Sequence, residues 1–209
     1  GGAIGDCLAA ALEWSGHDVT REFYVNDAGN QINKFGASLS VRYMQLFEGE
    51  EKHPLPEDCY QGMDILDHAR EFAKLYGDKY VNAPEEERRK ALVDYALPLN
   101  IAALERDLGR YRIHYDVWFR ESVLHREGKV TAICELKENG WAYEKEGALW
   151  YNNIKMMIEK AEKAGKPLSE AEIAELKDDV LVRANGVPTY FAADIAYHYN
   201  KFAERGFHR

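Results

Sequence analysis

The sequence has few of the residues that build metal sites and disulfide frameworks. Its 209 residues include three cysteines, Cys7, Cys59 and Cys134, which lie far apart and form no CxxC pair. An odd number of widely spaced cysteines is typical of free thiols in a reducing compartment. The seven histidines are scattered as well, without an HxH or HxxxH pair. The sequence therefore predicts no metal site and indicates a cytoplasmic protein.

Long hydrophobic runs and an excess of positive charge are also missing. No apolar stretch approaches the roughly 18 residues of a membrane span, and the start of the chain shows no secretory signal. We therefore expect no membrane partner. Acidic residues number 36 against 27 basic ones, for a net charge of −9. A chain this acidic does not, as a whole, attract nucleic acid electrostatically, so we expect no DNA partner. Any contact with RNA would come from a local patch of this chain or from parts of the protein outside it.

The residues that are present indicate a globular α/β protein, with 46% hydrophobic and 30% charged residues. Helical spacing of apolar residues begins at Ile4 and stops at Gly16. A strand rich in β-branched and aromatic residues follows over Asp18–Val25, then a polar turn and a helix over Gln31–Phe47. Helix, strand, polar loop and helix in this order are typical of an α/β fold.

The middle of the chain is mostly helical, and its end repeats the α/β pattern. Helices are predicted over 62–76, 84–108, 130–139, 154–164 and 169–176, with strands near 114–119 and a β-hairpin near 141–151. A short strand at Val180–Arg183 precedes a tight turn and a helix that begins at Thr189. We expect this strand and the one ending at Val25 to lie in one partial parallel sheet.

Two clusters of side chains are candidate binding residues. Asn26, Asp27 and Gln31 follow a predicted strand, and ligands of open α/β sheets bind where strands end; the alternative is a turn that caps the next helix. Tyr190 and Asp194 are four residues apart and so share one face of a helix, where a phenol and a carboxylate can hold a cation. The alternative there is a helix with one packed ring and one acid at its edge.

A third stretch, Asp116–Glu121, places aromatic residues next to charged ones at a predicted strand end. The alternative is an aromatic strand end that packs against a core. From the residues alone, the sequence supports an α/β domain with an insertion and a site at its strand ends.

Three longer runs of the sequence resemble arginyl-tRNA synthetases, in the same order and across nearly the whole chain. They are Tyr24–Ile32 (YVNDAGNQI), Tyr115–Ser122 (YDVWFRES) and Asp178–His198 (DDVLVRANGVPTYFAADIAYH). The resemblance implies a class I synthetase fold, in which a Rossmann-like parallel sheet is interrupted by a largely helical insertion. It also implies ATP-dependent activation of L-arginine and its transfer to tRNA(Arg), with ATP as a substrate and Mg²⁺ expected in the full-length enzyme.

The resemblance carries over to single residues. It implies that Tyr190 and Asp194 bind the arginine substrate, with Asp194 pairing with the guanidinium group, and that Asn26, Asp27 and Gln31 line the site. It assigns no catalytic residue, because the HIGH-type and KMSK-type motifs of the family do not occur in this sequence.

The resemblance also predicts an organisation for the chain. Residues 1–49 and 178–209 would be two parts of a catalytic core, and 50–177 a mostly helical insertion that carries the hairpin. We therefore expect an internal piece of the catalytic domain that is inactive alone. The alternative is a truncated, non-catalytic module that binds arginine or a protein partner.

Overall fold

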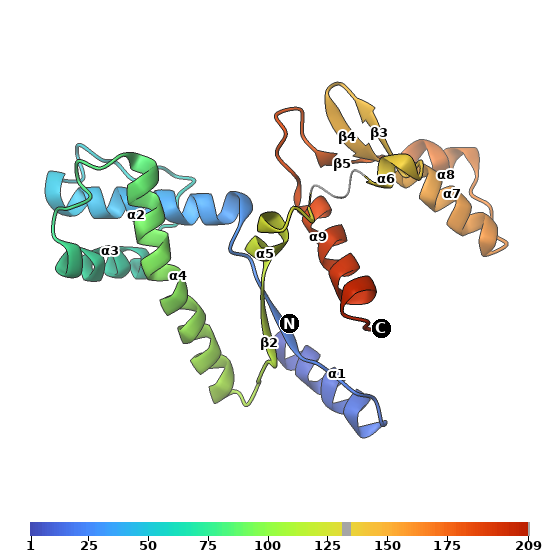
Figure 1. Cartoon of the computed structure of the whole chain (residues 1–209), viewed down its shortest axis with the longest axis horizontal. Helices are drawn as coiled ribbons and strands as arrows, with labels where there is room; N and C mark the ends of the chain where they lie inside the picture. The colour runs from blue at the N-terminus through green and yellow to red at the C-terminus, as the bar shows by residue number, and fades with distance from the viewer. Residues whose placement is uncertain (131–134, 209) are drawn as a thin grey trace. The chain divides into compact units, whose positions relative to one another are not determined.

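The protein forms two compact units, Gly1–Arg120 and Glu121–Arg209 (Figure 1). The computed structural model describes residues 1–130 and 135–208, apart from the side chain of Glu135. The boundary between the compact units lies at a different place from the predicted boundaries after residues 49 and 177, and those boundaries stay a prediction. Each unit is described by itself below.

The first unit contains four helices and two strands in its described residues. They are α1 (Gly2–Trp14), β1 (Glu22–Val25), α2 (Gly29–Glu48), α3 (Met63–Tyr76), α4 (Glu85–Arg110) and β2 (Val117–Arg120). The four predicted helices of this region are confirmed, and both strands are shorter than predicted. β1 and β2 pair in parallel, with Phe23 opposite Trp118 and their rings stacked at 4.7 Å.

The core of the first unit lies among α2, α3 and α4, which pack together in Figure 1. Apolar residues recur every three or four positions, so each helix presents one continuous apolar face to the others. The buried members are Phe35, Leu39, Tyr43, Met44, Ile65, Ala69, Phe72, Leu92 and Ala96. Tyr43 is buried with its hydroxyl donating to the carbonyl of Gly77 at 2.7 Å, and this burial raises its pKa.

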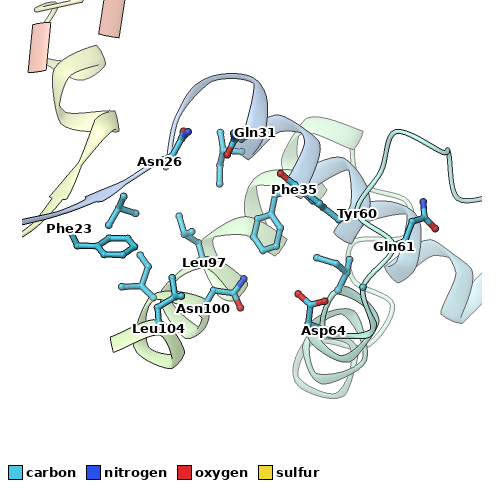
Figure 2. A pocket seen from close by; sticks show the side chains of 15 residues that line it. Phe23, Asn26, Gln31, Phe35, Tyr60, Gln61, Asp64, Leu97, Asn100 and Leu104 are labelled. Atoms are coloured by element: carbon cyan, nitrogen blue, oxygen red, sulfur yellow. The ribbon is translucent and has the colours of Figure 1, made fainter. Parts of the chain in front are cut away.

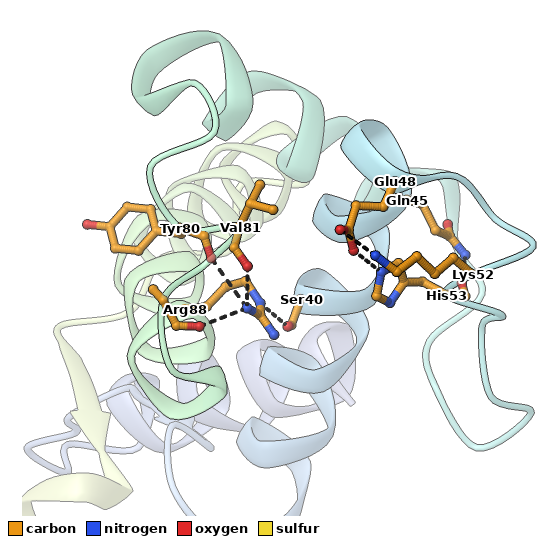
Figure 3. Close-up of polar contacts among 9 residues, drawn as sticks. Ser40, Gln45, Glu48, Lys52, His53, Tyr80, Val81 and Arg88 are labelled. Carbon is orange, nitrogen blue, oxygen red and sulfur yellow. Dashed lines mark hydrogen bonds and ion pairs between the residues drawn. The ribbon is translucent and has the colours of Figure 1, made fainter.

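Polar contacts fix the loops around this core (Figure 3). The guanidinium of Arg88 on α4 donates to the hydroxyl of Ser40 on α2 at 2.8 Å and to three carbonyls of the loop before α4, those of Tyr80, Val81 and Ala83. At the end of α2, the carboxylate of Glu48 contacts both Lys52 and His53 at 2.5 Å. Hydrogen bonds from these two side chains lower the pKa of Glu48, and the bond from Lys52 has the larger effect.

The second unit combines a small antiparallel sheet with short helices. Its elements are α5 (Glu121–Arg126), α6 (Glu135–Glu138), β3 (Ala142–Lys145), β4 (Ala148–Tyr151), α7 (Asn153–Lys163), α8 (Glu170–Glu175), β5 (Asp179–Val182), α9 (Tyr190–Tyr199) and the π-helical turn η2 (Asn200–Glu204). The predicted hairpin is confirmed as β3 and β4. Its turn has positive φ at Glu146 and Gly147, as a tight hairpin turn requires.

The prediction that the two end strands lie in one partial parallel sheet is wrong. β1 pairs with β2, whereas β5 pairs antiparallel with β4 in a separate three-stranded sheet of order β3-β4-β5. β4 ends fewer than thirty residues before β5 begins, so this pairing closes a short loop, whereas pairing with β1 would close a loop of more than 150 residues. The hairpin therefore supplies the partner of β5 in the described structure.

Some predictions fall at the edge of what the structure describes. Cys7 and Cys59 are free thiols, while Cys134 lies outside the described residues. The helix predicted over 130–139 is described only from Glu135, as α6. None of the helices described here has the length and apolar character that a membrane span needs.

Candidate functional site

The first candidate cluster lies at a pocket in the first unit. Asn26 follows β1 directly and Gln31 lies in the first turn of α2, and both line a pocket of about 440 Å³ (Figure 2). Apolar side chains from β1, α2 and α4 form much of its wall, among them Phe23, Phe35 and Leu97. The structure thus brings Asn26 and Gln31 to one cavity.

Several polar side chains of this pocket were not found from the sequence. Tyr60, Gln61, Asp64 and Asn100 come from the loop before α3, from α3 and from α4. The one sequence feature that points to them is the position of Tyr60 and Gln61, between an irregular, proline-containing stretch and a predicted helix. They meet because α2, α3 and α4 pack together, and that packing does not follow from local sequence.

Three of these polar side chains contact other groups of the same unit. The amide nitrogen of Gln61 donates to the carbonyls of Pro56 and Cys59, and the amide oxygen of Asn100 lies 2.7 Å from a ring nitrogen of His68. The ammonium group of Lys34 lies over the ring of Tyr60 at 5.3 Å. The pocket thus combines aromatic walls with amides and one carboxylate, which suits a ligand that is both planar and polar.

Asp27, the third predicted residue of this cluster, is not among the residues that line the pocket. Its side chain is only 5% exposed, and its carboxylate lies 3.8 Å from the guanidinium of Arg120 at the end of β2. The N-cap residue of the next helix, α2, is Ala28, which has no polar side chain. Asp27 therefore links the ends of the two paired strands.

The second candidate cluster lies on α9 in the second unit. Tyr190 is the first residue of the helix and Asp194 lies one turn later, so both side chains share a face. Tyr190 is 44% exposed, and Asp194 is exposed. Within the described residues the Asp194 carboxylate has no ion-pair partner. An exposed carboxylate beside a phenol can receive the planar donor fork of a guanidinium group.

The opposite face of α9 holds the helix in its unit. Ala192, Ala193, Ala196 and Tyr197 are buried, and the ring of Phe191 meets that of Tyr151 on β4 edge-on at 5.5 Å. Burial raises the pKa of Tyr151. Further along, the ring nitrogen Nδ1 of His198 lies 2.8 Å from the backbone carbonyl of Asp194.

The structure groups the five predicted residues by unit. Asn26, Asp27 and Gln31 belong to the first unit, Tyr190 and Asp194 to the second. Over the ranges 1–130 and 135–208, no group of three or more His, Cys, Asp or Glu side chains is arranged to hold a metal ion.

The chain is similar over its whole length to named ligases. It is 52% identical over 208 residues to the arginine–tRNA ligase of Ruminiclostridium cellulolyticum and 53% identical over 208 residues to that of Caldanaerobacter subterraneus subsp. tengcongensis. Each match covers 99% of this chain and 34% of the relative. The chain thus spans about a third of the length of the curated relatives it matches.

A comparison with solved structures agrees with this relationship. A protein of Campylobacter jejuni, provisionally named an arginyl-tRNA synthetase, superposes with a TM-score of 0.76 at 29% sequence identity, over 99% of this chain and 41% of that one. No family model matches the chain. The sequence and the fold are therefore related to the same group of proteins.

Proposed function

We propose that this chain is part of an arginine–tRNA ligase. Nearly its whole length is similar to about a third of the length of each such enzyme. The enzyme activates L-arginine with ATP and transfers it to tRNA(Arg). The observation that carries this proposal is identity of about one half to named ligases across 99% of the chain. Because those relatives are ligases, this identity supports the proposal of an enzyme over that of a truncated binding module.

The side chains on α9 account for recognition of the arginine side chain. Asp194 accepts two parallel hydrogen bonds from the guanidinium group, and its charge balances that of the ligand. Tyr190 packs against or bonds to the same group from one turn earlier. Lysine cannot reproduce this pairing, because its ammonium group lacks the planar fork of donors.

The pocket in the first unit supports a role for Asn26 and Gln31 in lining the active site. Both residues stand where β1 ends and α2 begins, the place where α/β folds bind ligands. The parallel pairing of β1 with β2 is consistent with a Rossmann-like sheet of a class I synthetase. The carboxylate of Asp27 links the ends of β1 and β2 through its contact with the guanidinium of Arg120.

The proposal assigns no catalytic residue to this chain. Activation of an amino acid by ATP depends on positioning and on donors that neutralise phosphate charge, and the sequence contains neither of the family's ATP motifs. Loss of one such donor costs roughly a hundred- to a thousandfold in rate. We therefore propose that the 209-residue chain alone does not charge tRNA.

Charging of tRNA by the complete gene product tests the proposed function. Purified protein would be given total tRNA, ATP and each labelled amino acid in turn, with the isolated 209-residue chain alongside. We expect arginine alone to be attached, and only by the complete product. Attachment of another amino acid at a similar rate, or of none, contradicts the proposed function.

A further inference from the structure

The hydroxyl of Thr189 ties the start of α9 to strand β5. Thr189 is the N-cap residue of α9, yet its side chain makes no capping hydrogen bond. The hydroxyl instead donates to the carbonyl of Val180 at 2.7 Å and lies 3.2 Å from that of Leu181. Threonine at an N-cap commonly accepts a hydrogen bond from its own helix, so this side chain is used for a different purpose.

The backbone around Thr189 reinforces the same attachment. The N–H of Thr189 donates to the carbonyl of Leu181 at 2.9 Å, and Leu181 is fully buried in the second unit. Within the turn, the N–H of Arg183 donates to the carbonyl of Val187 at 3.0 Å. The start of α9 is thus held against a strand whose own position is fixed by burial.

Tyr190 follows Thr189 directly, and Asp194 lies one turn further on. A rotation or shift of the first turn of α9 moves both side chains together, because a helix turns as a rigid element. The ring contact of Phe191 with Tyr151 holds the helix at a second point.

We propose that Thr189 is a positioning residue for arginine recognition, acting through Tyr190 and Asp194. This inference rests on the proposed function. The Thr189 hydroxyl sets how far the Tyr190 phenol and the Asp194 carboxylate lie from the bound guanidinium group. Thr189 does not touch the substrate itself.

Replacement of the hydroxyl tests the proposal in the complete gene product. Thr189→Val keeps the branched shape and suits the extended backbone of this residue, with φ of −89° and ψ of 169°, but removes the donor. We expect the arginine KM in tRNA charging to rise about 3- to 10-fold, as for loss of a neutral hydrogen bond. The kcat and the ATP KM stay within about twofold, because a loss of substrate binding alone leaves turnover unchanged.

Two further variants separate positioning from general stability. Thr189→Ser keeps the hydroxyl and restores the arginine KM to within about twofold of wild type. Ser169→Ala removes the side chain that caps α8 through its capping box with Glu172, so it weakens a helix of the same unit. This control leaves the arginine KM unchanged.

Amide hydrogen exchange measures the attachment without any substrate. We expect Thr189→Val to speed exchange in the first turn of α9 by about tenfold, because a local opening becomes easier. Unchanged exchange, an unchanged arginine KM, an equal rise of both KM values, or failure of Thr189→Ser to restore arginine binding overturns the proposal. A wild-type protein that charges no arginine at all overturns the proposed function instead, and with it the role of Thr189, even where the exchange result holds.

Discussion

At the scale of single residues, Tyr143 and Asp178 connect the hairpin to the start of β5. The hydroxyl of Tyr143 donates to the Asp178 carboxylate at 2.6 Å, and the other carboxylate oxygen accepts from the N–H of Ile154 at 2.9 Å. The hydrogen bond to Asp178 and, after it, burial raise the pKa of Tyr143 to about 12. The neutral phenol is therefore favoured by folding.

A raised tyrosine pKa makes part of the stability depend on alkaline pH. The contribution is fully present below the unfolded pKa of about 10 and is lost as pH rises through the folded value of about 12. We expect carbon-13 NMR of labelled tyrosine to show one ring that titrates near pH 12. The resonance should vanish in Tyr143→Phe and persist in the control Tyr111→Phe, whose ring is 80% exposed. A late-titrating ring that survives Tyr143→Phe would refute the assignment.

The phenol of Tyr190 belongs to the same scale. If it donates one neutral hydrogen bond to bound arginine, Tyr190→Phe should weaken arginine binding by about 0.5–1.5 kcal/mol. Tyr199→Phe is the matched control, because Tyr199 is exposed and lies half a turn around the same helix. Equal effects of the two variants on the arginine KM would show that the Tyr190 hydroxyl has no specific role.

At the scale of elements, Arg88 joins α4 to α2 and to the loop between α3 and α4. Arg88→Met keeps an apolar stem but leaves four acceptors without their donor, so we expect local opening to become easier by about 1–3 kcal/mol. Hydrogen exchange over residues 77–84 measures this. Arg106→Met, on the exposed side of α4, is the control. Similar exchange in both variants would mean that the Arg88 contacts do not stabilise the loop.

The elements themselves were largely predictable, and their pairing was not. Periodic apolar residues such as Leu39 and Tyr43, or Ile65, Ala69 and Phe72, identify a helix within a short window. Val180–Arg183 was equally clear as a strand, but nothing in its four residues states whether its partner is β1 or β4. Pairing depends on loop closure and on side chains that lie far away in sequence. The prediction was therefore wrong about which sheet contains Val180–Arg183.

The candidate site shows the same limit. Asn26 and Gln31 follow from their position after a strand, and the structure places both at one pocket. Asn100 and Asp64 reach the same pocket only because three helices pack together. Local sequence does not predict that packing, so it does not identify these two residues. The order Thr189, Tyr190 and Asp194 is visible in the sequence, but the return of the Thr189 hydroxyl to β5 is a tertiary contact.

At the scale of the whole molecule, the chain has two compact units, each with its own predicted part of a site, and its curated relatives are about three times as long. The proposed function depends most on Asp194, which we propose pairs with the guanidinium group of the substrate arginine. Asp194→Asn keeps the size of the side chain and removes its charge. The residue is exposed in this chain, so the substitution should leave folding intact.

The most direct test is therefore the arginine KM of the complete gene product with Asp194→Asn. Removal of one partner from a hydrogen-bonded charge pair that is buried in the complex costs about 2–5 kcal/mol, or roughly 30-fold to several thousand-fold in affinity. We expect a rise of that size for arginine, an ATP KM within about twofold of wild type, and no change in the control Asp179→Asn, an exposed acid of β5. An arginine KM within twofold of wild type would contradict the proposed pairing of Asp194 with the guanidinium group.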